Sequence, residues 1–302
     1  MSEQNHRPGG TTLPPGMEQV FRCVRPVIFQ DEASGLPAIP GTGFFVKLFG
    51  EIFFITARHV VDNDYDFNDE QLVIQYSATS NRGVPIAEVH RFRSTDENDT
   101  DHVDIVIYKT DRARLEMHLF VGSPPYDFSG KDCLRNYSRG MRLSFSGLSP
   151  DIGEYDYENR DYRIALSCGD LSYLEPESLL RSIHIGRVDV NSSFPDFDGL
   201  SGSPLFYFSS SSERSASSQF AGMLLRGTRS SGIMLFMEAQ CVFNYLLAFF
   251  LRELPEPVAR KKLEDLVKWY HPDIGYEYRP RGTISASNFS IRVLDGEYQR
   301  LL

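Results

Sequence analysis

Three short segments carry residue types that together perform nucleophilic chemistry. His59 ends a long apolar stretch, directly after a small threonine, an alanine and an arginine. Asp104 opens the alternating run DIVIYK, and Ser201 lies in the glycine-containing run DGLSGSPLF. A serine hydroxyl is a weak nucleophile at neutral pH, and an imidazole held by a carboxylate makes it reactive by accepting its proton. The three residues are therefore candidates for nucleophile (Ser201), general base (His59) and orienting carboxylate (Asp104).

Each residue also has a simpler structural interpretation. A lone histidine at a strand end is more often a hydrogen-bonded core residue, and a lone aspartate before a strand is often a turn residue. Ser203 is a second serine in the same segment, but Ser201 fits the nucleophile better because Gly199 precedes it by two positions and Gly202 follows it. Glycines adopt backbone conformations closed to other residues, which allows two backbone N–H groups to point at one spot beside the hydroxyl.

Taken in this order, the segments resemble the trypsin-like serine peptidases of the chymotrypsin fold (clan PA). The separations, 45 residues from His59 to Asp104 and 97 from Asp104 to Ser201, are about what two six-stranded barrels require. GTGFF at 41–45 is similar to the strand that enters the histidine hairpin, and FAGMLLRG at 220–227 to the strand that lines the substrate cleft. The resemblance covers about residues 18–250 and is closer to cytoplasmic and HtrA-like bacterial relatives than to secreted digestive enzymes.

The resemblance implies a serine endopeptidase that cleaves a protein or peptide substrate through an acyl-enzyme. The N–H groups of Gly199 and Ser201 would form the oxyanion hole, and neither a cofactor nor a metal is implied. No aspartate clearly matches the one that selects lysine or arginine, so a small or apolar side chain before the cleaved bond is favoured. The substrate pocket would be built from Pro195, Asp196, Leu225, Arg226 and Gly227.

Two other functions stay open at this stage. A catalytically silent protein could use the same fold as a binding module, although a scaffold has no need of all three triad residues. An esterase could use the same triad on a different acyl substrate. A regulatory or defence-associated role with a narrow substrate is an analogy at the level of the fold alone.

Activation by cleavage of a precursor is not expected. Digestive relatives carry an aspartate directly before the nucleophile that pairs with a new N-terminus, whereas this chain has Leu200 there. We expect Leu200 to anchor the loop by apolar burial. The activity must then be restrained in another way. The candidates are a narrow substrate range, a regulatory protein partner, or an oxyanion loop that becomes ordered on binding.

The elements that must position these residues are short β-strands. Runs of β-branched and aromatic residues separated by turn residues predict an all-β protein of two six-stranded antiparallel β-barrels with C-terminal α-helices. Residues 43–50 and 52–61 flank Gly50 and predict a hairpin. The other predicted strands are 71–78, 84–92, 104–109, 141–148, 162–168, 182–190, 204–208, 220–227 and 232–236.

The ends of the chain differ in character from its middle. Residues 1–16 are polar and predict a flexible tail, followed by the peptidase domain at 17–252, with the junction of the two barrels near 120–140. The serine-rich run 209–218 predicts a loop between two strands. Residues 253–302 form a C-terminal extension. An apolar helix is predicted at 238–252, at the end of the peptidase domain. The extension is predicted to hold an amphipathic helix at 255–270 and a strand near 289–294.

Composition and charge exclude several classes. The chain has 302 residues and a formal net charge of −10, which argues against nucleic-acid binding. The longest apolar stretch, Val242 to Leu251, is too short to span a membrane, and the first residues contain no apolar signal-peptide region. The four cysteines lie far apart, which is typical of reduced thiols in a cytoplasmic protein. We therefore expect a cytoplasmic protein that binds neither nucleic acid nor membranes.

One acidic segment is a candidate metal site. DNDYDFNDE at 62–70 spaces its aspartates as a calcium-binding EF-hand loop does. However, Phe67 stands where that loop needs glycine, and Val73 where it needs the closing glutamate. A solvated acidic turn is the favoured interpretation, so no metal is assigned.

Overall fold

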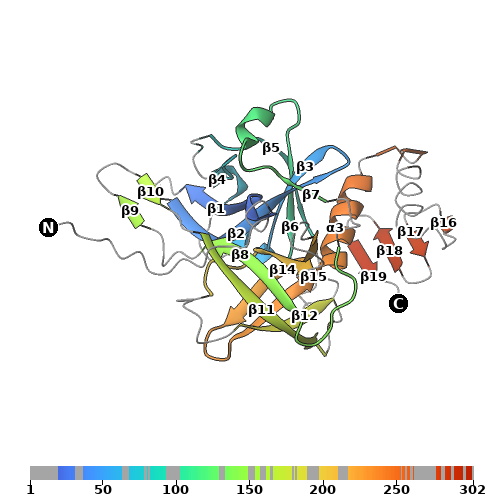
Figure 1. Cartoon of the computed structure of the whole chain (residues 1–302). Helices are drawn as coiled ribbons and strands as arrows, with labels where there is room; N and C mark the ends of the chain where they lie inside the picture. Colours follow the sequence, from blue (N-terminus) through green and yellow to red (C-terminus); the bar gives the residue numbers. More distant parts are fainter. Residues whose placement is uncertain are drawn as a thin grey trace.

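The computed structural model shows a mostly β protein with two barrel-like sheets and a third, C-terminal sheet (Figure 1). Six strands of each barrel-like sheet pair in antiparallel order, as the sequence predicts. The structure describes residues 20–30, 37–62, 68–77, 80, 82–92, 103–128, 133–148, 154–156, 161–163, 166–178, 180, 182–188, 197–209, 217–252, 254–255, 257–258, 261, 277–279, 283–286, 289–294 and 297–300. The predicted tail at 1–16 lies outside them.

The first sheet holds the strands next to the candidate histidine and aspartate: His59 follows β3, and Asp104 precedes β6. Its strands follow one another in the order β4-β1-β2-β3-β6-β5, and β7 pairs in parallel with β2. In the described part of the chain this sheet has the form of a half-barrel, consistent with the barrel-like fold that the sequence predicts. The strands are β1 (Val24–Gln30), β2 (Pro37–Leu48), β3 (Glu51–Thr56), β4 (Leu72–Val73), β5 (Ile86–Arg91), β6 (Val106–Thr110) and β7 (Tyr126–Asp127).

The predicted hairpin at Gly50 is confirmed. β2 and β3 pair from Gly43 with Thr56 to Leu48 with Glu51. The two turn residues, Phe49 and Gly50, have φ values of 51° and 86°. A two-residue turn with both φ values positive matches the twist of the flanking strands, and glycine adopts it without strain.

The second sheet closes into a six-stranded antiparallel barrel. Neighbouring strands follow the order β11-β12-β15-β14-β13-β8, with β8 again beside β11. β13 and β14 pair on either side of the serine-rich run, as expected for a hairpin. The strands are β8 (Arg142–Leu148), β11 (Leu166–Pro176), β12 (Ile183–Val188), β13 (Pro204–Ser209), β14 (Ser217–Thr228) and β15 (Ile233–Glu238).

Short elements and a third sheet complete the chain. α2 (Arg58–Val61) follows β3, and the 3-10 helices η1 (Asp69–Gln71) and η3 (Met117–Phe120) lie in connections of the first sheet. β9 (Glu154–Asp156) and β10 (Asp161–Arg163) form a separate hairpin. The C-terminal sheet consists of β16 (Glu277–Arg279), β17 (Thr283–Ala286), β18 (Phe289–Leu294) and β19 (Glu297–Arg300), paired in that order.

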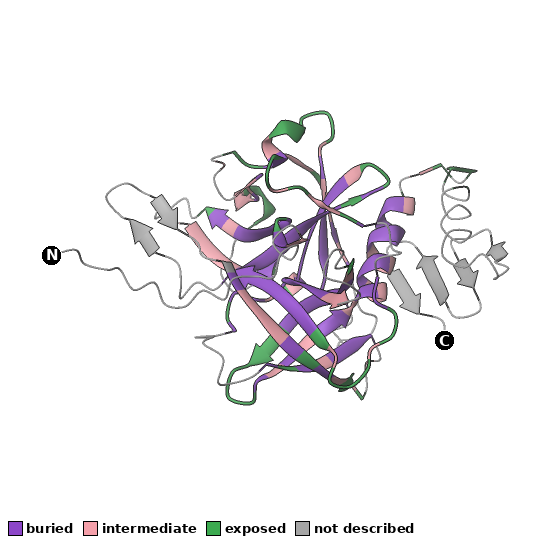
Figure 2. Cartoon of the chain, in the orientation of Figure 1, coloured by how far each residue is buried: buried purple, intermediate pink, exposed green. Residues whose placement is uncertain are grey.

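The helix predicted at 238–252 is confirmed as α3 (Ala239–Arg252). Its apolar side chains are buried, and Phe249 packs edge-on against Phe53 of β3. Phe243 makes a similar contact with Phe128. One buried cluster joins α3, the first sheet and the outer wall of the barrel, and Figure 2 shows the helix mostly purple. Burying each of these phenylalanines stabilises the fold by roughly 1.5–3 kcal/mol.

The remaining C-terminal predictions are tested in part. Pro257, Val258 and Lys261 are helical, and the rest of the helix predicted at 255–270 lies outside the described residues. The strand expected near 289–294 is β18. No described helix has the length and apolarity that crossing a lipid bilayer requires.

Candidate active site

His59 and Asp104 are joined by two hydrogen bonds. The chain leaves β3 and turns into α2, which carries His59, while Asp104 lies just before β6, the neighbour of β3 in the sheet. Asp104 Oδ1 accepts the backbone N–H of His59 at 2.9 Å, and Oδ2 lies 2.6 Å from His59 Nδ1. Because an ionised carboxylate only accepts, Nδ1 is the donor, and Nε2 is left as the nitrogen that can take a proton.

Asp104 is buried, whereas the ring of His59, which it contacts, is exposed to solvent. Asp104 is 8% exposed, whereas the side chain of His59 is 45% exposed. The carboxylate is thus held inside the sheet with its oxygen atoms directed at the histidine, while the ring reaches solvent. A substrate can approach the ring without displacing the carboxylate.

Ser201 lies in the connection between β12 and β13. Residues 197–203 of this connection, which we call the nucleophile loop, make tight turns. Leu200 N–H donates to the Phe197 carbonyl at 3.2 Å, and Ser203 N–H donates to the Leu200 carbonyl at 3.0 Å. Gly202 has a φ of 85°, and a Cβ there would lie 1.9 Å from the Thr42 carbonyl oxygen. Only glycine fits at this position, both for its backbone conformation and for its close approach to β2.

A single residue of β2, Thr42, holds this loop against the first sheet. Its N–H donates to the Ser201 carbonyl at 2.9 Å, and its hydroxyl donates to the Gly199 carbonyl at 2.6 Å. The same hydroxyl accepts the N–H of Leu148, in β8 of the barrel, at 2.9 Å. Its own carbonyl accepts the Thr56 hydroxyl at 2.6 Å. Thr42 is fully buried and bonded through each of its polar groups, so it fixes the backbone on both sides of Leu200.

The same strand brings Ser201 next to the histidine segment. A Cβ at Gly41 would lie 2.7 Å from the Val60 side chain and 3.1 Å from the Ser201 carbonyl oxygen. The residue after His59 and the backbone of Ser201 therefore flank one glycine of β2. Among the described residues, no hydrogen bond joins the Ser201 hydroxyl to the His59 ring. Catalytic hydrogen bonds of this kind often tighten only when substrate is bound.

The burial of neighbouring residues favours Ser201 over Ser203 as the nucleophile. Ser203 is completely buried, and its hydroxyl has no hydrogen-bond partner in the part of the chain that is described. Ser201 is partly exposed. Leu200 is 1% exposed and belongs to the apolar core of the barrel, where it anchors the loop as the sequence predicts.

The two N–H groups predicted to form an oxyanion hole lie on either side of Leu200. Gly199 has a φ of 80°. Within the described ranges, neither the Gly199 N–H nor the Ser201 N–H donates to a protein acceptor.

The predicted substrate-pocket residues fall into three groups. Leu225 is buried in the cluster shared with α3 and does not reach the surface. Arg226 and Gly227 are exposed, and a Cβ at Gly227 would lie 2.9 Å from the Phe197 ring, beside the nucleophile loop. Pro195 and Asp196 lie outside the described residues.

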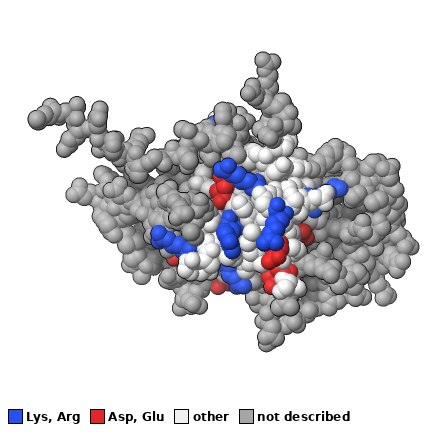
Figure 3. Space-filling model, turned by 60° about the horizontal axis from the view of Figure 1, so that its bottom comes forward, with Lys and Arg blue, Asp and Glu red and all other residues white. Residues whose placement is uncertain are grey.

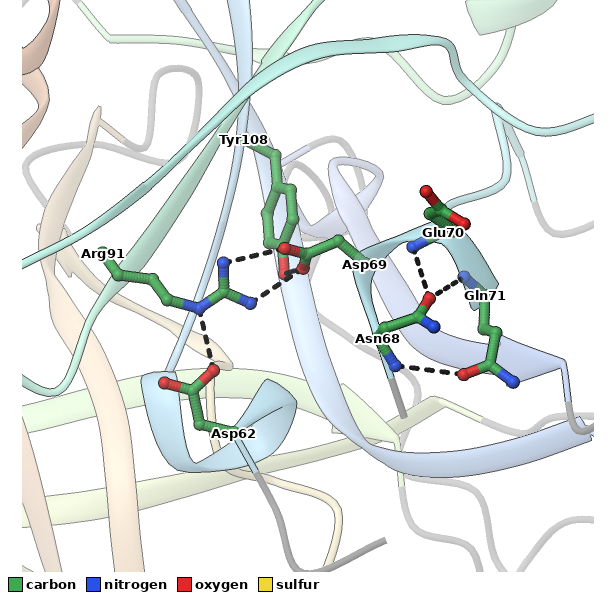
Figure 4. Close-up of polar contacts among 7 residues, drawn as sticks. All are labelled: Asp62, Asn68, Asp69, Glu70, Gln71, Arg91 and Tyr108. Atoms are coloured by element: carbon green, nitrogen blue, oxygen red, sulfur yellow. Dashed lines mark hydrogen bonds and ion pairs between the residues drawn. The ribbon is translucent and has the colours of Figure 1, made fainter. Parts of the chain in front are cut away.

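The described residues of the acidic segment 62–70 lie around an arginine, whereas residues 63–67, with most of the predicted metal-loop positions, lie outside the described residues. Arg91 donates to Asp62 at 2.8 Å and forms a bidentate pair with Asp69 at 2.8 Å, and the Tyr108 hydroxyl also donates to Asp69 (Figure 4). Asn68 caps the adjacent helix η1. Burial by itself raises the pKa of Asp69, but the hydrogen bonds and charge of Arg91 outweigh it, so this pKa is lowered. No cluster of three or more acidic, histidine or cysteine side chains that could hold a metal occurs among the described residues.

The cysteines are free thiols, as expected. Cys23 is fully buried, and burial raises its pKa to about 12, so it is an inert core residue. The nearby Arg25 is also buried, and its guanidinium donates to backbone carbonyls of three segments, with burial lowering its pKa to about 10.

Sequence reasoning missed the role of Thr42. The segment GTGFF had been singled out only as a strand. Its two glycines and the small threonine are the available signal, because a strand with little side-chain bulk allows another backbone to approach closely.

Comparison of the chain with models of known protein families, and with curated proteins, finds no match.

Proposed function

We propose that this chain is a serine endopeptidase with His59, Asp104 and Ser201 as its catalytic triad. The observation that carries the proposal is the double contact of the buried Asp104 with His59. It sets the tautomer in which Nε2 accepts a proton at the protein surface. The attachment of the Ser201 loop to β2, next to the histidine segment, supports the same assignment.

In this mechanism the Ser201 oxygen forms a bond to the carbonyl carbon of the substrate while its proton passes to His59 Nε2. Asp104 stabilises the imidazolium that results. The N–H groups of Gly199 and Ser201 stabilise the negative carbonyl oxygen, and one such donor is typically worth roughly 2.7–4 kcal/mol in the transition state. The amide C–N bond then breaks as Nε2 returns the proton to the leaving amine. Water, deprotonated by Nε2, attacks the acyl carbon, and the bond to the Ser201 oxygen breaks as Nε2 returns the proton to that oxygen. No step requires a metal or a cofactor.

The proposal includes a nucleophile loop that is ordered without precursor cleavage. Buried Leu200 and the hydrogen bonds of Thr42 support it, because they anchor the loop where digestive relatives use a buried ion pair. It also includes a cytoplasmic location, which the four free thiols support.

The proposal is tested with the full chain and a library of peptides from a digested proteome. We expect cleavage that is lost in Ser201→Ala and kept in Ser203→Ala. Hydrolysis of simple esters without any peptide cleavage would instead identify an esterase. A wild-type chain that cleaves neither class of substrate, although folded, would contradict the proposal and leave a binding module.

A further inference from the structure

The outer wall of the barrel carries a face that combines arginines with apolar residues. On three neighbouring strands, β12, β15 and β14, the side chains that point away from the barrel interior include Arg187 and Arg226, both exposed. Arg229 follows in the exposed turn after β14. Figure 3 shows basic side chains on a mostly uncharged surface, with acidic side chains beside several of them. We call this surface the arginine face, made of Ile185, Arg187, Arg226, Thr228, Arg229, Ile233 and Leu235.

The strand register places these residues side by side. Arg187 is paired with Ile233, which is paired with Thr228. One row further along, Ile185 is paired with Leu235, which is paired with Arg226. Paired residues on neighbouring strands point to the same side and lie about 5 Å apart. Met234, between the two rows, is buried inside the barrel, so both rows face outward. Half-buried isoleucine and leucine side chains thus lie between the arginines.

The charge of this face differs from that of the molecule. The chain as a whole has a net charge of −10, yet the outward positions of the face hold three arginines and no carboxylate. Arg142, on β8 elsewhere in the barrel, is already paired with Asp170. Arg187 and Arg229 have no carboxylate partner in the described part of the chain. These two uncompensated cations on an acidic protein favour a ligand of opposite charge.

The arginine face is continuous with the nucleophile loop through β14. Leu224 accepts the Gly202 N–H at 2.8 Å and donates to the Ser203 carbonyl at 2.8 Å. Arg226 follows two residues later, about 7 Å along the strand, and Thr228 about 13 Å along it. Since an extended peptide covers about 3.3–3.6 Å per residue, this face lies roughly two to five substrate residues from the bond that Ser201 attacks.

We propose that the arginine face binds an acidic segment of the protein substrate, on one side of the cleaved bond. The inference rests on the proposed peptidase function and adds a substrate class to it. Aspartate and glutamate would pair with the arginines, while neighbouring apolar side chains pack on the isoleucines and Leu235. A peptide fits better than a nucleic acid, because no aromatic side chain for base stacking stands among the outward residues of this face.

The test compares matched peptides cleaved by the full chain. A peptide taken from the library described above is made with glutamate, or with glutamine, at each position two to five residues before and after the cleaved bond. We expect glutamate to raise kcat/KM on one side only, and added salt to reduce this preference. Arg187→Gln and Arg226→Gln should each lower the preference about two- to fivefold, the range of single exposed ion pairs. Arg112→Gln is the matched control, because Arg112 is exposed just after β6 and, among the described residues, pairs with Glu51.

Other outcomes overturn the inference in distinct ways. Equal cleavage of glutamate and glutamine peptides, or equal effects of all three arginine substitutions, would remove the acidic-segment assignment but leave the peptidase intact. If no peptide is cleaved, binding of fluorescent glutamate-rich and glutamine-rich peptides to the full chain still tests the face by anisotropy. Selective binding of the glutamate-rich peptide, lost in Arg187→Gln, would support it without the peptidase. Selective binding of a single-stranded oligonucleotide at that face would show that its ligand is a nucleic acid.

Discussion

At the scale of single residues, the central pair is Asp104 and His59. The aspartate is almost entirely buried, and both of its oxygen atoms contact the histidine. A neutral amide of the same shape cannot accept through both atoms. In asparagine, the side chain would present an N–H to Nδ1 and favour the wrong ring tautomer.

The first prediction is that Asp104→Asn lowers kcat/KM toward a cleaved peptide by about 10⁴-fold, as is typical of triad enzymes. The measurement is steady-state kinetics of the wild type and the variant with the same peptide. Unchanged kinetics of Asp104→Asn would show that this pair is structural.

At the scale of elements, the nucleophile loop depends on β2. Thr42 bonds the loop, β3 and β8 through one buried side chain and its backbone. Valine has nearly the shape of threonine but cannot bond the Gly199 carbonyl or the Leu148 N–H. Both groups would then be buried without a partner, at a cost of about 1–3 kcal/mol each.

The second prediction is that Thr42→Val lowers kcat by roughly tenfold or more and leaves KM nearly unchanged. Removing an oxyanion donor itself costs about 10²–10³ in kcat, and a loop that holds its donors loosely loses part of that. Thr42→Ser, which keeps the hydroxyl, should restore most of the rate. The matched control is Thr110→Val, because the buried Thr110 hydroxyl bonds the Ile52 carbonyl within the first sheet, away from the loop. Equal losses of kcat in the two valine variants would indicate a general effect on stability.

A second element-scale feature is the ion pair of Arg91 with Asp69, which ties β5 to η1. The pKa of Asp69 is lowered in the folded protein, with Arg91 outweighing the effect of burial. A carboxyl group whose pKa falls on folding stabilises the fold above its ordinary pKa, near 3.9. This stabilisation is lost as the pH falls through the lower folded value.

The third prediction is therefore that Asp69→Asn is less stable than the wild type at pH 7 and differs less from it at pH 3. Urea unfolding at the two pH values measures this, with Glu70→Gln as the control, because the side chain of Glu70 is exposed on the same helix. A difference between wild type and Asp69→Asn that is the same at both pH values would exclude the carboxylate as the cause.

At the scale of the whole molecule, the loop lies between the two barrel-like sheets and is anchored from both. Leu200 is buried in the core of the barrel, and Thr42 reaches the loop from the first sheet. Full burial of a leucine stabilises by roughly 1.5–3 kcal/mol. No ion pair with a new N-terminus is needed for this anchorage.

The fourth prediction is that the intact chain is active without trimming, and that Leu200→Asp loses most of its activity because it buries an unpaired charge. The intact chain, verified by its mass, is assayed beside versions that begin at successive positions between 16 and 28. Activity confined to one trimmed version, and abolished by acetylating its amine, would contradict this prediction.

The sequence predicted those parts of the fold that local patterns encode. The hairpin at Gly50, the strands of the barrel and the apolar helix α3 follow from alternation, turn residues and a continuous apolar stretch. It did not predict β1 as a separate strand, the full length of β11, or three of the four C-terminal strands. Their pairing partners, rather than their own residue patterns, define them.

The candidate site was predictable to a similar degree. The sequence singles out His59, Asp104 and Ser201 by their types and by the order and spacing of the family they resemble, and the structure joins the first two by hydrogen bonds. The bonds of Thr42 were not predictable, because they join β2 to residues more than a hundred positions away and leave no periodic signal.

The most direct test of the central claim is covalent labelling by a fluorophosphonate, which reacts with a serine only when a base activates it. The full chain is incubated with the reagent, and the modified residue is mapped by mass spectrometry of its peptides. The account predicts one modification, at Ser201, that disappears in Ser201→Ala and His59→Ala and persists in Ser203→Ala. A folded chain that stays unmodified, or that is modified at Ser203 or elsewhere, would contradict it.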